Sequence, residues 1–244
     1  MLRTVIFSVF QRNSSHLARA PDRSLNTRLL THRHNLVFFK LFSDAAPKCW
    51  NCGATKTVNG PLLCPHCNVL QKPPDTSNYF TVLNIDQTFD IDHKLLTNKY
   101  RRMQSVLHPD KYSNKSREEQ EISSRYSSLV NNAYNTLRAP LKRAVHLLNL
   151  HGENVDEDQK IVDPEFLALI MELNEEIDAA TTPKQLRDLD DKNRKELETI
   201  RATLSSHFKQ LKVKEAKDEV MKMKYYNSIR MRINELLRNK GIVE

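Results

Sequence analysis

The chain contains four cysteines, and they form two pairs with the same internal spacing, Cys49 with Cys52 and Cys64 with Cys67. Eleven residues separate the pairs, which lets the chain fold back and place four thiolates around a single ion. A segment so short and so poor in apolar residues cannot be held by a hydrophobic core, so its ligands must fix its fold. The spacing therefore predicts a four-cysteine metal-binding module over about residues 47–70.

Zinc is the metal that two CxxC pairs of this spacing most often bind, as one structural ion with four thiolate ligands. At a reducing redox poise such pairs favour a metal over disulfides. Gly53 directly follows Cys52 and allows a tight turn in which backbone N–H groups point at a thiolate. Two alternatives stay open: an iron–sulfur cluster uses the same thiolates, and His66 could replace one of them.

The net charge of +8 is concentrated near the N-terminus. Residues 1–43 carry seven Lys and Arg against the single acidic residue Asp22, whereas the other 201 residues carry 31 basic and 29 acidic side chains. A basic segment with several Ser and Thr is typical of a mitochondrial transit peptide, and a disordered basic tail is the alternative. We therefore expect a protein of the mitochondrial matrix, with a cytosolic pool left open.

The balanced charge of the remaining chain does not predict a nucleic-acid-binding surface. No segment approaches the roughly 18 consecutive apolar residues that a membrane-spanning helix needs. We therefore expect neither nucleic acid nor a membrane among the partners, and the sequence leaves a homodimer open.

The pattern of apolar residues over 78–150 predicts helices joined by short breaks. The four Gly and the aromatic content of 7% give little sign of a sheet, and the paired prolines Pro73 and Pro74 interrupt the chain before this segment. Apolar residues at helical spacing predict helices over about 79–83, 92–107, 115–137 and 141–150.

Two of these helices carry apolar stripes that should face each other. The first stripe runs through Leu95, Leu96, Lys99 or Tyr100, Met103 and Leu107, and the second through Ile122, Tyr126, Leu129, Ala133 and Leu137. Their pairing predicts an antiparallel helical hairpin, because the connection between the helices is short.

The C-terminal segment, residues 160–240, predicts a bundle of three helices. Asp163-Pro164 and Thr182-Pro183 are helix start signals, since each combines an N-cap residue with a proline in the first turn. The expected helices cover about residues 163–180, 182–211 and 212–238. Their apolar positions, Leu169 among them, suit a bundle of long, thin helices. The predicted fold class is mainly α.

The tripeptide at the tip of the hairpin carries a resemblance to a known family. His108, Pro109 and Asp110 follow an amphipathic basic helix, and in this setting residues 78–150 resemble the J domain. The resemblance implies that the tripeptide stimulates ATP hydrolysis by a DnaK-type mitochondrial chaperone. Basic residues that would attract the acidic surface of the chaperone are Lys99, Arg101 and Arg102. These are fewer than in many general J proteins. The alternative is a turn in which Asp110 caps the next helix and His108 is solvated.

The segments around the predicted J domain narrow the resemblance. Neither a Gly/Phe-rich linker nor CxxCxGxG repeats follow; instead come Ala139-Pro-Leu-Lys-Arg-Ala, Leu147-Leu-Asn-Leu-His-Gly and the helix that starts at Asp163. This order is similar to the HscB family, the specialised co-chaperones of iron–sulfur cluster biogenesis. The module Cys49-Trp-Asn-Cys-Gly is similar to its animal mitochondrial form.

The HscB resemblance implies that the C-terminal bundle binds the iron–sulfur cluster scaffold protein. The positions that match the family's binding residues are Leu167, Ala168, Met171, Glu172, Glu175 and Tyr225. Leu167, Met171 and Glu175 share one helical face. Two positions depart from the bacterial pattern, since Ala168 is smaller than the methionine there and Ala179 replaces an acid.

The function implied by this resemblance is coupling of the scaffold to the chaperone, and we expect no catalytic residue in this chain. The main alternative is a general J-domain co-chaperone that recruits unfolded clients. A thiol-based oxidoreductase is a second alternative, but the chain has no GxGxxG loop, P-loop or nucleophile motif.

Overall fold

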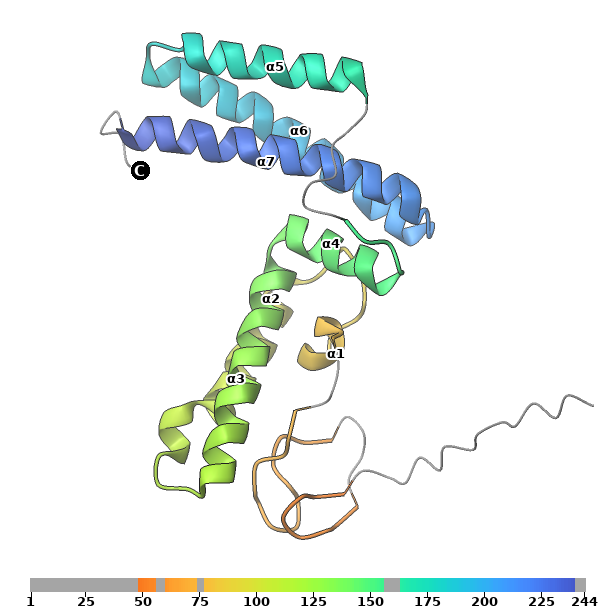
Figure 1. Cartoon of the computed structure of the whole chain (residues 1–244), viewed down its shortest axis with the longest axis vertical. Helices are drawn as coiled ribbons and strands as arrows, with labels where there is room; N and C mark the ends of the chain where they lie inside the picture. The colour runs from red at the N-terminus through yellow and green to blue at the C-terminus, as the bar shows by residue number, and fades with distance from the viewer. Residues whose placement is uncertain (1–47, 56–59, 74–76, 156–162, 240–244) are drawn as a thin grey trace, which may run out of the picture. The chain divides into compact units, whose positions relative to one another are not determined.

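The computed structural model describes residues 48–55, 60–73, 77–155 and 163–239. Among these residues, helices begin at Tyr79, and residues 48–73 contain no helix; there is no strand and only two isolated β-bridges, Lys48 with Thr55 and Leu63 with Leu70 (Figure 1). The prediction of a mainly α fold is confirmed. The predicted transit peptide, residues 1–43, lies outside the described residues.

The first group of helices comprises α1 (Tyr79–Leu83), α2 (His93–Leu107), the 3₁₀ helix η1 (Pro109–Tyr112), α3 (Arg117–Arg138) and α4 (Pro140–Leu150). Local signals set their starts. The carboxylate of Asp92 accepts hydrogen bonds from the backbone N–H groups of Lys94 and Leu95, and Ser116 caps α3 in the same way. Proline opens α4, where its missing N–H costs no helical hydrogen bond.

Helices α2 and α3 form the predicted antiparallel hairpin. The rings of Tyr100 and Tyr134 stack with centroids 4.1 Å apart, and the side chain of Gln104 donates to Asn131 at 2.7 Å. Leu96 and Leu107 are buried within the hairpin core. Leu95 departs from the predicted stripe, because it is 46% exposed on the neighbouring side of the helix.

The second group is a bundle of α5 (Pro164–Ala179), α6 (Pro183–Lys209) and α7 (Val213–Asn239), drawn in turquoise to blue in Figure 1. Asp163 caps α5, and Thr182 forms a reciprocal capping box with Gln185 at the start of α6. The core of the bundle consists of large apolar side chains, including Ile177, Leu186, Leu197, Leu204, Val220 and Ile233. Leu169 was expected among them but is 43% exposed.

The loop before α2 contacts the last turns of α6. The ring of Phe89 stacks on Phe208 with centroids 5.6 Å apart, and the carboxylate of Asp90 accepts from Ser205 and Lys209 at 2.5 and 2.7 Å. Partial burial opposes ionisation of Asp90, but these two donors outweigh it and lower its pKa. An aromatic stack and a carboxylate with two donors therefore join the loop before α2 to α6.

Candidate functional site: a metal module and two exposed helical surfaces

The two CxxC pairs form two similar turns. The backbone N–H of Gly53 donates to the carbonyl oxygen of Cys49 at 3.0 Å, and that of Asn68 donates to Cys64 at 2.9 Å. Gly53 and Asn68 both adopt a positive φ, 72° and 56°, which Gly and Asn tolerate better than other residues. The structure thus shows the predicted turn at Gly53, and Asn68 plays the same part in the second pair.

These turns bring the four thiols together. The sulfur atoms of Cys49 and Cys67 lie 3.7 Å apart, as do those of Cys52 and Cys64, and all four lie within 4.8 Å of one another. A tetrahedral site with metal–sulfur distances of about 2.3 Å has sulfur–sulfur edges of about 3.8 Å, whereas a disulfide would need about 2.05 Å. The four cysteines therefore fit one metal ion. His66 is exposed and is not part of the cluster.

Backbone N–H groups and neighbouring thiols shift the pKa values of the cysteines in opposite directions. The backbone N–H of Cys52 lowers the pKa of Cys49 to about 6, and that of Cys67 lowers the pKa of Cys64. At Cys52 a backbone bond from Ala54 acts in the same direction, but burial and the neighbouring thiols outweigh it and raise its pKa to about 12. A bound cation would act with the backbone groups at Cys49 and Cys64 and against the raised pKa of Cys52.

Two further side chains support the cluster. The buried amide of Gln71 donates to the sulfur of Cys49 at 3.3 Å and to the carbonyl oxygen of Val69 at 2.8 Å. The indole N–H of Trp50 donates to the carbonyl oxygen of Leu70 at 2.7 Å. Sequence reasoning missed Gln71, because its contact with Cys49 spans 22 residues and nothing in its type distinguishes it from a linker residue.

The tip of the hairpin presents two exposed polar side chains on a fixed base. The side chains of His108 and Asp110 are 57% and 88% exposed. Leu107 and Tyr112 flank them and are buried, and the hydroxyl of Tyr112 donates to the carbonyl oxygen of Val106 at 3.1 Å. Pro109 opens η1 and fixes the backbone between the two polar residues.

The predicted basic residues of α2 do not all share one side. Lys99 and Arg102 are three residues apart and lie on one face, whereas Arg101 points to a different side of the helix. Leu95 extends the face of Lys99 and Arg102, since these residues are spaced by four and then three. An exposed leucine therefore adjoins the basic residues, although its spacing predicted a position in the core.

The predicted scaffold-binding residues of α5 are gathered on a surface. Phe166, Ile170 and Ile177 fill the buried side of the helix. Met171 is 64% exposed, Leu167 is half-buried, and the other members of the set on α5, Ala168, Glu172 and Glu175, are exposed. Tyr225 of α7 is half-buried and packs edge-on against Phe166 with centroids 5.7 Å apart. These residues are therefore accessible and do not form the bundle core.

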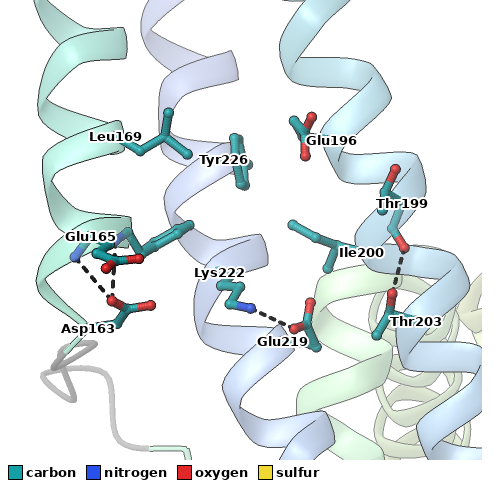
Figure 2. A pocket seen from close by; sticks show the side chains of 11 residues that line it. Asp163, Glu165, Leu169, Glu196, Thr199, Ile200, Thr203, Glu219, Lys222 and Tyr226 are labelled. Atoms are coloured by element: carbon teal, nitrogen blue, oxygen red, sulfur yellow. Dashed lines mark hydrogen bonds and ion pairs between the residues drawn. The ribbon is translucent and has the colours of Figure 1, made fainter.

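A pocket of about 460 Å³ lies on another side of α5 and is lined by residues of α5, α6 and α7 (Figure 2). Leu169 lines it together with Phe166, Ile200 and Tyr226. Its polar lining is mostly acidic, with one ion pair between Lys222 and Glu219 at 2.8 Å; the acids are Asp163, Glu165, Glu196 and Glu219. The pocket explains the exposure of Leu169, and the predicted scaffold-binding residues lie outside it.

Comparisons with known proteins agree with this architecture. Residues 78–146 match the model of the DnaJ domain, and residues 162–234 match that of the HSCB C-terminal oligomerisation domain. The iron-sulfur cluster co-chaperone protein HscB of Mus musculus is 36% identical over 192 residues, which cover 77% of this chain and 82% of the relative. The chain belongs to the HscB family. The human relative is 35% identical, with 77% of this chain and 81% of that protein covered.

Solved structures of HscB proteins give the same result. The crystal structure of human co-chaperone protein HscB matches with a TM-score of 0.73 at 35% identity, covering 78% of this chain and 98% of that chain. Chaperone HscB from Vibrio cholerae matches with a TM-score of 0.61 at 28% identity, covering 68% and 99%. The family inferred from the residues is therefore confirmed. No helix among the described residues of this HscB-family chain combines the length and apolar character required to cross a membrane.

Proposed function

We propose that this HscB-family chain is a co-chaperone of iron–sulfur cluster biogenesis in the mitochondrial matrix. It binds the cluster scaffold protein through the exposed face of α5 with Tyr225 and engages a DnaK-type chaperone through the tip of the hairpin. The names of the mouse and human relatives support this role. The observation that carries it is the presence of two separate exposed surfaces, a polar tip at His108–Asp110 and an apolar and acidic face around Met171.

The proposed mechanism is coupling of two partners. A chain that holds the scaffold and also contacts the chaperone raises the effective concentration of one for the other. Lys99 and Arg102 speed the encounter with an acidic chaperone surface, while the short tip discriminates between two chaperone conformations. The catalytic groups for ATP hydrolysis belong to the chaperone, and this chain contributes binding energy alone.

We further propose that the four-cysteine module holds one structural zinc ion. Four thiolates leave no open ligand position, so the ion supplies folding energy to the module, on the order of 10 kcal/mol for such sites. Elemental analysis of the purified chain should find one zinc per chain. Replacement by cobalt should give the absorption of a tetrahedral thiolate site, and iron with acid-labile sulfide would contradict the assignment.

The test of the main proposal is steady-state ATP hydrolysis by the mitochondrial DnaK-type chaperone with this chain, with and without the cluster scaffold. Asp110→Asn should abolish the stimulation, because it removes the charge of the tip while keeping its size. Asp86→Asn, in an exposed turn of the same helical group, is the matched control and should stimulate normally.

Stimulation that rises more than additively with scaffold and is lost in Asp110→Asn supports the specialised role. Stimulation that is indifferent to scaffold would instead favour a general J-domain co-chaperone. No stimulation under either condition would rule out both.

A further inference from the structure

The edge between α5 and α7 is held at two points. Near the start of α5, Phe166 packs against Tyr225. Further along, the guanidinium of Arg232 donates from Nη1 to Asn174 Oδ1 at 2.6 Å and from Nη2 to Asp178 Oδ1 at 2.5 Å. Tyr225 and Arg232 are seven residues apart, which places them on the same face of α7. The two contacts therefore bracket one continuous edge of the bundle.

The residues that Arg232 contacts adjoin the proposed scaffold-binding face. Asn174 lies three residues after Met171, and Asp178 lies three residues after Glu175, so each is a helical neighbour of a member of that face. Ile170 and Ile177, on the adjacent side of the helix, are buried. Arg232 thus binds α5 along the boundary between its buried side and its exposed face.

The geometry requires an arginine. The guanidinium is planar and offers several N–H donors in a fixed fork, so it reaches oxygens on two successive turns of α5 at once. Asn174 is itself oriented, because its Nδ2 donates to the carbonyl oxygen of Ile170 at 2.7 Å. An ammonium group at position 232 would keep the charge but lose the fork.

The energetics point to local order more than to overall stability. The side chains of Arg232 and Asp178 are 42% and 62% exposed, and ion pairs this accessible contribute little to the stability of a whole domain. Helix α5, however, is the shortest of the three, at 16 residues against 27 for α6 and for α7. Few contacts fix its position on α7, so each of them matters more there.

We propose that Arg232 is a positioning residue, which holds α5 on α7 so that Met171 and Tyr225 form one preorganised surface for the scaffold. This inference rests on the proposed function, since the surface is the one assigned to the scaffold. A partner that contacts two helices at once must bear the entropy of ordering them unless they are already fixed. Arg232 removes part of that entropy before binding.

The test uses the full chain and two measurements, the dissociation constant for the cluster scaffold and amide hydrogen exchange without scaffold. In Arg232→Met, exchange in α5 should rise while α6 and α7 keep their protection, and affinity should fall about tenfold, as expected when a preorganising contact is lost. Arg230→Met is the matched control. Arg230 is also 42% exposed and on α7, but it pairs with Asp190 of α6. Its loss should leave α5 exchange and scaffold affinity unchanged.

A charge swap separates positioning from direct contact. In Asp178→Arg with Arg232→Asp, the ion pair is restored with reversed polarity but the bond to Asn174 Oδ1 is not, so α5 protection and scaffold affinity should recover together and in part. Recovery of protection without recovery of affinity would overturn the positioning role, because Arg232 would then touch the scaffold itself. Unchanged exchange in Arg232→Met would also overturn it. Met171→Asp tests the proposed function separately. If that variant binds scaffold with wild-type affinity, the scaffold-binding face is wrongly assigned. The exchange measurement on Arg232→Met still shows whether Arg232 holds α5 on α7.

Discussion

The hairpin tip and the α5 face are both exposed recognition surfaces, but they are built differently. The tip comes from adjacent residues, and its base is held within the hairpin by buried Leu107 and Tyr112 and by the hydroxyl of Ser123, which donates to the carbonyl oxygen of Leu107 at 2.7 Å. The α5 face combines residues of two helices, and its geometry depends on contacts that span 54 to 58 residues. A change must fall within the hairpin to damage the tip through these contacts, whereas the α5 face can be damaged from a helix more than 50 residues away.

The largest expected effect concerns the buried base of the tip. Leu107 is fully buried, so Leu107→Ala should lower the free energy of unfolding of the hairpin by about 3 kcal/mol, the usual cost of an internal Leu→Ala cavity. ATPase stimulation should fall with it, while scaffold affinity stays unchanged. Denaturant unfolding and scaffold titration measure the two effects.

Leu95→Ala on the same helix is the control for Leu107→Ala. Because Leu95 is 46% exposed, its truncation should change the free energy of unfolding by no more than about 0.5 kcal/mol. Equal destabilisation by both variants would show that burial of Leu107 does not make it more important to the stability of the hairpin than exposed Leu95.

A smaller effect is expected from the centre of the α5 face. Met171→Asp places a charge on an apolar contact and should weaken scaffold binding by about tenfold, as for other well-packed contact residues. Stability should hardly change, since the side chain is 64% exposed. Stimulation of the chaperone in the absence of scaffold should stay at the wild-type level, which separates the two surfaces.

Met231→Asp is a close control for Met171→Asp, because Met231 is 65% exposed but lies on a different side of α7 from Tyr225. Calorimetric titration with scaffold should give wild-type affinity. If both variants weaken binding equally, the effect is one of net charge and the proposed face loses its support.

The same contrast explains which parts could be predicted from the sequence. The helices begin where capping residues such as Asp92 and Ser116 stand and where prolines open α4, α5 and α6, because these signals act over a few residues. The four-cysteine cluster followed from ligand spacing. By contrast, Arg232 and Gln71 act on residues far along the chain, and nothing in their immediate sequence indicates the partner.

Leu95 and Leu169 show a second limit of prediction. Both fit an apolar stripe by spacing, but a helix buries only the side that another helix covers. Leu95 lies just beside buried Leu96, and Leu169 lines the pocket between α5, α6 and α7. Spacing alone cannot tell the edge of a stripe from its centre.

The smallest expected effect is a difference in acid sensitivity between the two groups of helices. His146 of α4 is 9% exposed, its ring stacks on Tyr79 at 4.6 Å, and its Nε2 accepts from the backbone N–H of Tyr79 at 3.1 Å. Burial lowers the pKa of His146 below its ordinary value of 6.5. Below pH 6.5 the unfolded chain therefore takes up a proton that the folded chain does not, and the stability of α1 and α4 should fall until the pH reaches the folded pKa.

The α5–α7 edge should not share this dependence, because the Arg232 contact contains no histidine. Amide hydrogen exchange at pH 7.5, 6.5 and 5.5, corrected for intrinsic rates, should show falling protection in α1 and α4 and a smaller change in α5. His146→Gln keeps a hydrogen-bond acceptor but removes the titration, so the pH dependence of α1 and α4 should flatten even if their protection is lower throughout. A slope that persists in His146→Gln would assign the acid sensitivity of α1 and α4 to another group.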